Sequence, residues 1–280
     1  ARSGPVEKFR QVVVVSAISA FTMAVGALLA GRAQSPLLAM GFLTLAFAVQ
    51  SLGETWITLA AVGKKGLEFP ATFEGMRADL RKVMVVAGPM TLVSLLSASG
   101  AWLVGRILLS APDGAHGFAL YSIGMQWFAL ALLIPGITSR VLLPKFVREN
   151  DHQKSRELLW HGVAVAVAAS MAGLLLLGSL GPWLMRLYGE TYAVPHWFLA
   201  AFLAAAVLSA PANPIGNAIV AKDGQTMWLL LSLGAFLTLM LVAWLARGIG
   251  PLAGALAQGA AAFLMSGSAL IVFLRRKYPA

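Results

Sequence analysis

The chain has 280 residues, of which 59% are hydrophobic and only 11% are charged, and its formal net charge is +10. Soluble domains usually contain about 45–50% apolar and about 25% charged residues, so this composition excludes a globular fold in water and requires a surface that faces lipid. The absence of cysteine excludes disulfides, thiolate metal sites and cysteine nucleophiles.

Eight apolar runs are long enough to cross a bilayer, which needs about 20 helical residues. In chain order they are 12–30, 37–62, 84–110, 118–141, 163–180, 197–220, 227–246 and 251–274. Their hydrophobicity extends around the helix, as lipid-buried helices require, and it lacks the alternation of barrel strands. The sequence therefore predicts an all-α, polytopic transmembrane helical bundle of about eight spans.

The basic residues between these runs are distributed asymmetrically. If the chain starts on the cytoplasmic side, only Arg32, Arg106, Arg186 and Arg247 of its 21 lysines and arginines fall on the outer side. Cytoplasmic loops carry such an excess, and a missed or invented span would destroy the pattern, so we expect both ends inside. The same pattern favours the lipid bilayer, with its anionic headgroups, over nucleic acid as the partner.

Several local signals concern how the spans are joined and packed. Residues 64–82 predict a short surface helix that divides two spans from six, and 148–161 also predicts a helix. The Gly250/Gly254 spacing predicts close helix contact. Prolines that interrupt spans or their ends favour a transporter over a simple membrane anchor. They are Pro89, Pro135, Pro144, Pro211 and Pro214.

Signatures of catalysis are absent. The sequence has no GxxxxGK[ST], HExxH or GxSxG motif, and Gly248-x-Gly250-x-x-Ala253 matches a dinucleotide fingerprint by letters only, because it opens a span and follows no strand. The four histidines fall in loops or at interfaces, where solvation explains them better than catalysis or metal binding. We therefore expect no enzyme activity, no cofactor and no metal site.

Ionisable residues inside spans are costly and mark candidate functional sites. Glu54 is the one acid within a predicted span and is the candidate for coupling transport to a proton or cation. The alternative is a paired or protonated structural acid. Arg106 and Arg140 are candidates for binding an anionic substrate in a cavity, and the alternative for both is that their long stems extend to the interface.

Amide side chains form a second group of candidates for substrate binding. Asn213 and Asn217 stand beside a proline and a glycine in the sixth span. This predicts either a broken helix that faces a cavity or a kink whose carbonyls the asparagines satisfy. Gln126 in the fourth span and Gln50 in the second are weaker cases of the same kind.

The chain from Leu120 onward resembles one family. The segments LYSIGMQW, LALLIPGITSRVLLPKFVREND, LYGETY, NPIGNAIVAKDG and GPLAGALAQGAA follow one another. Their order and spacing are similar to the C-terminal lobe of lipid-linked oligosaccharide flippases. These are the O-antigen and polysaccharide exporters of the multidrug/oligosaccharidyl-lipid/polysaccharide superfamily. The resemblance covers roughly residues 81–277, and no one of its motifs is diagnostic alone.

The resemblance implies a two-lobe transporter that works by alternating access. Residues 1–66 would be the last two helices of the N-terminal lobe, 67–83 a cytoplasmic linker, and 84–280 the six-helix C-terminal lobe. Four helices would precede this chain, which would then be an N-terminally truncated fragment. The implied function is flipping of polyprenyl-diphosphate-linked oligosaccharide across the bacterial inner membrane for cell-surface polysaccharide or lipopolysaccharide synthesis, with polysaccharide assembly proteins as further partners.

Three other functions stay open. A multidrug/cation antiporter of the same superfamily would need more buried acids than Glu54. A membrane-embedded glycosyl- or acyltransferase would need a set of catalytic acids or histidines near a membrane face, which we do not find. A non-catalytic scaffold would tolerate the loss of charge at Glu54, Arg106 and Arg140, and no family motif covers these three residues.

Overall fold

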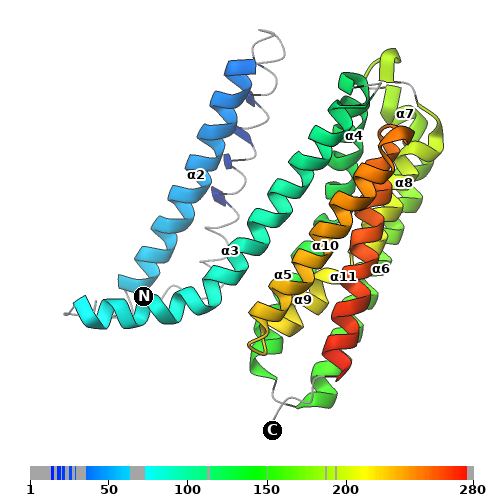
Figure 1. The fold of residues 1–280 in the computed structure, drawn as a ribbon. Helices are drawn as coiled ribbons and strands as arrows, with labels where there is room; N and C mark the ends of the chain where they lie inside the picture. Colours follow the sequence, from blue (N-terminus) through cyan, green and yellow to red (C-terminus); the bar gives the residue numbers. More distant parts are fainter. Residues whose placement is uncertain are drawn as a thin grey trace. The chain divides into compact units, whose positions relative to one another are not determined.

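The structure, a computed structural model, divides into two compact units, Ala1–Asp79 (unit 1) and Leu80–Ala280 (unit 2). All regular secondary structure in the described residues is helical (Figure 1), which confirms the predicted all-α class. The described residues are 14–15, 18–19, 21–22, 25–26, 29, 36–63, 73–111, 114–149, 151–186, 188–192 and 194–275.

Unit 1 contains α2 (Pro36–Gly63), which corresponds to the second predicted span. Much of the first predicted span lies outside the described residues, but those that are described are helical. One of them, Ser19, donates a hydrogen bond from its hydroxyl to the Ala46 carbonyl of α2 at 2.9 Å. α3 (Phe73–Leu109) begins in this unit, so the described part of the predicted surface helix continues directly into the third span.

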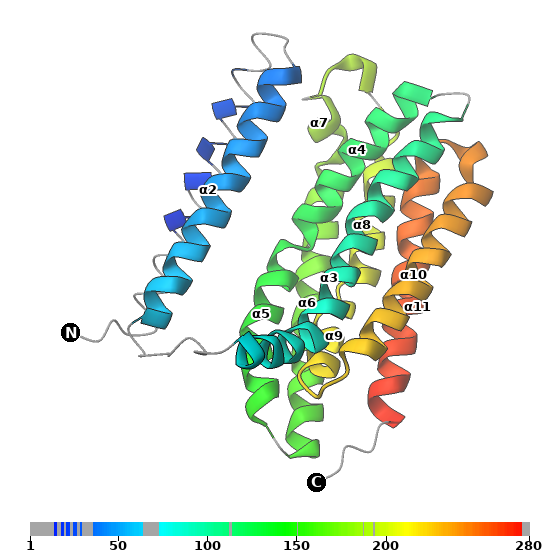
Figure 2. The same ribbon diagram turned by 60° about the vertical axis from the view of Figure 1, so that its left-hand side comes forward.

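Unit 2 holds the remaining helices. After α3 the elements are α4 (Gly114–Ala131), α5 (Leu133–Arg148), α6 (His152–Ser179), α7 (Gly181–Arg186), the 3₁₀-helix η1 (Glu190–Tyr192), α8 (His196–Ser209), α9 (Ala212–Val220), α10 (Gln225–Leu245), the 3₁₀-helix η2 (Arg247–Ile249) and α11 (Leu252–Arg275). α8 packs against α4, α6 and α11, and its Phe202 and Leu203 are fully buried. α10 and α11 run side by side in both views (Figures 1 and 2).

The helices of unit 2 have the length and composition of membrane spans. Within the described residues, five helices are long and apolar enough to cross a membrane, and α4 and α5 pass the same test together as a pair bent by 42°. The chain is therefore a multi-pass membrane protein. The total of eight spans and the orientation with both ends inside stay predictions.

The bend between α4 and α5 follows from Pro135. Because Pro135 has no N–H, it leaves the Ala131 carbonyl, one turn earlier, without its usual helical donor. The hydroxyl of Ser170 on α6, which is fully buried, donates to that carbonyl at 3.4 Å. The neighbouring helix thus stabilises the break, as broken helices in lipid require.

The other predicted proline breaks divide into two groups. Pro211 lies between α8 and α9, and Pro214 lies in the first turn of α9, where the missing N–H costs no helical hydrogen bond. Pro89 and Pro144 instead lie inside the continuous helices α3 and α5. The prediction that these two prolines interrupt their spans is therefore wrong.

Gly254 allows α11 to pack directly against α4. A Cβ atom at this position would clash with the ring of Tyr121, and the neighbouring Ala253 and Ala255 are buried as well. The predicted close contact therefore holds at Gly254. Gly250 contributes differently, because it precedes α11 and adopts a φ of 66°, which favours glycine.

Candidate functional site

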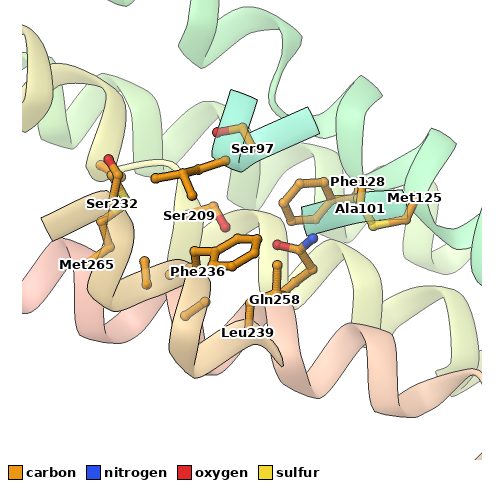
Figure 3. Close-up of a pocket in the computed structure, with 15 residues that line it drawn as sticks. Ser97, Ala101, Met125, Phe128, Ser209, Ser232, Phe236, Leu239, Gln258 and Met265 are labelled. Carbon is orange, nitrogen blue, oxygen red and sulfur yellow. The ribbon is translucent and has the colours of Figure 1, made fainter. Parts of the chain in front are cut away.

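The candidate site is a cavity inside unit 2, between α3, α4, α8, α9, α10 and α11 (Figure 3). Its volume is about 300 Å³, which has room for several water molecules. It is lined by Leu96, Ser97, Ala101, Met125, Phe128, Ser209, Ala212, Ser232, Ala235, Phe236, Leu239, Gln258, Ala261, Ala262 and Met265. The lining is therefore mostly apolar and carries no ionisable side chain.

Three serines bring hydroxyl groups to the cavity from three different helices. Ser209 and Ser232 donate to carbonyls of their own helices, those of Ala205 and Trp228, each at 2.8 Å. Their protons are thus used, and their oxygens can still accept hydrogen bonds from a guest. Ser97 on α3 is exposed, so the cavity is not sealed from its surroundings.

Gln258 is the most versatile polar group of the cavity. Its amide forms a hydrogen bond with the hydroxyl of Tyr121, and that hydroxyl also lies 3.5 Å from the Ala101 carbonyl. The Tyr121 ring is held in turn by its contact with Gly254. Because a glutamine amide offers two donors and two acceptor positions, Gln258 retains capacity for a guest. The cavity can therefore bind hydroxyl groups or water, but it supplies no charge.

Arg106 lies away from this cavity. It occupies the last turn of α3 and is exposed in a shallow surface pocket beside Ser110. Val104 and Leu108, on the opposite side of the helix, belong to the hydrophobic core. At this position the guanidinium also complements the negative end of the helix dipole.

Asn217 joins α9 to α5. Its amide donates to the Ser139 carbonyl at 2.7 Å, so it satisfies a carbonyl of a neighbouring helix rather than one of its own helix. Arg140, the next residue of α5, is exposed, and so is Asn213. None of these three predicted substrate-binding residues lines the cavity.

Gln126 is used for a contact between elements, and Glu54 belongs to the other unit. The Gln126 side chain accepts a hydrogen bond from the Tyr188 hydroxyl at 3.2 Å, which ties the segment after α7 to α4. Glu54 belongs to α2 of unit 1, but its side chain lies outside the described part of the chain. The predicted roles of all these residues stay predictions.

The sequence reasoning missed the polar residues of the cavity. Gln258 carries a usable signal, because an amide inside a Gly- and Ala-rich span needs a partner in lipid. The serines carry none, since a hydroxyl in any helix can bond to a carbonyl of its own preceding turn. In the described residues, no group of three or more His, Cys, Asp or Glu side chains could hold a metal ion.

Comparison with known proteins gives a partial match. No family model matches the chain, and no solved structure matches it. A protein of Ralstonia nicotianae (strain ATCC BAA-1114 / GMI1000), named EPS I polysaccharide export inner membrane protein EpsE, is 29% identical over 124 residues, which are 42% of this chain and 28% of the relative. The protein of the same name from Ralstonia solanacearum is 29% identical over 113 residues, which are 38% of this chain and 26% of the relative.

The matched stretch thus spans less than a third of the length of either relative. The chain is a multi-pass helical membrane protein that is similar, over part of its length, to polysaccharide export inner membrane proteins.

Proposed function

We propose that this protein is a bacterial inner-membrane transporter that flips polyprenyl-diphosphate-linked oligosaccharide by alternating access, without a catalytic step of its own. The observation that carries the proposal is the similarity to proteins named as polysaccharide export inner membrane proteins. In this proposal unit 2 acts as the C-terminal lobe of a two-lobe transporter, and unit 1 contributes the last helices of the other lobe.

The physical problem of such a transporter is the headgroup of its substrate. A sugar chain cannot cross hydrocarbon unaided, because each buried polar group without a partner costs several kcal/mol. The broken spans of unit 2 and its neutral cavity, which carries hydroxyl and amide groups, fit a protein that must offer hydrogen bonds at membrane depth. The lipid tail can remain in the bilayer throughout.

In the proposed mechanism, Arg106 and Arg140 bind the diphosphate in turn. Both side chains are exposed on unit 2. α3 and α4 run antiparallel, as the contact of Gly105 with Phe118 and that of Ala101 with Tyr121 show, so Arg106 lies near one end of the unit and Arg140 toward the other. Guanidinium groups bind phosphates through strong, charge-assisted hydrogen bonds. Two such groups at different depths would lower the barrier at successive positions of the headgroup.

The second candidate function is a multidrug/cation antiporter of the same superfamily. Its cargo is cationic, so it needs acids along the translocation path, and Glu54 is the one candidate for that role. The neutral lining of the cavity gives a cation no counter-charge. Within the part of the chain that the structure describes, the neutral lining therefore favours a glycan over a cation as the substrate.

The proposal is tested by expressing the full-length version of the protein, with the helices expected before this chain, in cells that lack their own polysaccharide flippase and measuring surface glycan. We expect restored export with the wild type, and loss of export with Arg106→Ala and with Arg140→Ala at equal membrane levels. Arg156→Ala, which removes an exposed cation on α6, serves as the matched control.

Each outcome has a distinct meaning. No export by correctly inserted wild-type protein would contradict the flippase function. Export with both arginine variants at the wild-type level would overturn the diphosphate role while leaving the flippase function in place. For Glu54, unchanged transport and unchanged pH dependence in Glu54→Gln would remove the ion-coupling role.

A further inference from the structure

A second polar feature lies at the end of unit 2 where α5 turns into α6. A surface pocket of about 480 Å³ is lined there by Lys145, Arg148, Glu149, Lys154, Glu157, Leu158 and His161. α5 and α6 pack against each other along this turn. Unlike the central cavity, this pocket is lined by ionisable side chains.

The carboxylates of the turn are already engaged in local hydrogen bonds. Asp151 caps α6 by accepting from the backbone N–H groups of Gln153 and Lys154, at 2.8 and 3.4 Å. Glu149 accepts from the backbone N–H of Asp151 at 3.0 Å, and Glu157 accepts from the Gln153 amide at 3.3 Å. The acids therefore serve to build the turn.

The cations of the pocket have no such engagement. Within the described residues, the side chains of Lys145, Arg148 and Lys154 make no hydrogen bond or ion pair. A fourth cation, Lys222, donates to the Glu149 carbonyl and thereby fixes the turn from α9's side. Three free cations from two helices thus surround one pocket, and their natural ligand is an anion with several oxygen atoms.

The side chains around the pocket suit a bound lipid better than a soluble anion. Along the same faces of α5 and α6, the next turns carry Val141 and Ile137, at four and eight residues from Lys145, and Val165, four residues after His161. These three side chains are 58%, 56% and 48% exposed. Trp160, directly before His161 in the chain, is 43% exposed, and tryptophan prefers the level of the headgroups. The charged residues of the pocket are thus followed by exposed apolar side chains along the same helix faces.

We propose that this pocket binds the phosphate headgroup of an anionic glycerophospholipid, whose acyl chains lie along the exposed valine and isoleucine side chains of α5 and α6. Basic pockets at the ends of membrane helices bind anionic headgroups in this way. The proposal is independent of the transported substrate. A bound lipid would hold α5 against α6 on the far side of the break that Pro135 introduces.

The test is a thermal unfolding titration of the purified protein in detergent, because a ligand that binds the folded state raises the unfolding midpoint. Dioleoyl-phosphatidylglycerol is compared with dioleoyl-phosphatidylcholine and with inorganic phosphate. We expect only the anionic lipid to raise the midpoint. In Lys145→Gln/Lys154→Gln, the lipid concentration for half of the effect should rise about thirtyfold, since each basic side chain contributes to headgroup attraction.

The matched control is Arg156→Gln/Arg275→Gln, which removes two exposed cations outside the pocket and should leave the titration unchanged. Equal weakening in both double variants would overturn the proposal in favour of general surface charge. An equal response to phosphatidylcholine, or an equal response to inorganic phosphate, would also overturn it. Should the double variant fail to fold, Lys154→Gln alone is compared with Arg156→Gln.

Discussion

The cavity inside unit 2 and the pocket at the α5–α6 turn satisfy their polar groups in opposite ways. In the cavity, neutral hydroxyl and amide groups bond to carbonyls or to Tyr121 and leave only hydrogen-bonding capacity. At the turn, the acids are engaged while three cations are free. The difference follows from solvation, because a charge is costly in the interior of a membrane bundle and inexpensive at the headgroup level.

This contrast separates two tasks within one unit. The cavity can offer hydrogen bonds but no counter-charge, which suits neutral, hydroxyl-rich groups of a cargo. The pocket at the turn selects for negative charge and holds it at the surface. Substitutions that change charge or packing should therefore affect the stability of the protein differently in the cavity and at the turn.

The largest effect is expected from adding a charge to the cavity. Gln258→Glu should lower the free energy of unfolding by about 2–3 kcal/mol, because a carboxylate inside a membrane bundle needs a partner that this cavity lacks. The same change at Gln153, on the exposed first turn of α6, should cost less than about 0.5 kcal/mol, since the helix dipole offsets repulsion from Glu157. Unfolding by SDS titration in mixed micelles measures both, and equal losses would break the comparison.

The next largest effect is expected at the close contact between Gly254 and Tyr121, which supports the cavity. Gly254→Ala should destabilise by about 1–3 kcal/mol, because the new methyl group overlaps the Tyr121 ring that positions Gln258. Gly267 on the same helix has open space around it, so Gly267→Ala should be neutral or stabilise by up to about 1 kcal/mol through helix propensity. The same SDS titration applies, and a similar cost at both positions would show that helix propensity, not packing, dominates.

At the turn, the engaged acids are predicted to be structural. Asp151→Ala should cost about 1 kcal/mol, because two backbone N–H groups of α6 lose their cap. Asp151→Asn keeps a capping oxygen and should recover most of that loss. Hydrogen exchange at the first turn of α6 reports the effect locally. Equal losses in the two variants would assign the role of Asp151 to its charge rather than to capping.

The smallest effect is expected for the bond between α9 and α5. Asn217→Ala should cost about 0.6 kcal/mol and no more than about 1.7 kcal/mol, the range of hydrogen bonds between membrane helices. Asn213→Ala should change stability little, because Asn213 is exposed and donates no bond in the described structure. Measuring both stability and glycan export in these two variants separates a packing role from a role in substrate binding. Loss of export in Asn213→Ala at full stability would support the predicted substrate contact.

Much of the fold could be predicted because hydropathy and helix length are properties of short segments. Each of the last six apolar runs became one helix or a broken pair of helices. Their ends were less predictable. The charged segment before the fifth span merged with that span into α6, since Asp151 caps a helix that begins at His152.

The candidate site was far less predictable than the fold. Sequence reasoning selected charged and amide residues, among them Asn217 and Gln126, which the structure uses for contacts between elements. It overlooked Gln258 on α11. The role of this residue depends on Tyr121 of α4, whose ring packs against Gly254, also on α11. No local pattern contains that arrangement, because Tyr121 and Gly254 are brought together only by the packing of α4 on α11.

The sequence by itself determined that this chain forms a bundle of helices in a membrane, because an apolar segment of about 20 residues has few other stable states in lipid. Its prolines determined where helices could weaken. Tertiary structure alone decided which of them break, since Pro135 has Ser170 beside the carbonyl that it frees. It also decided which polar groups share a cavity and which cations remain free, because both depend on partners far away in the chain.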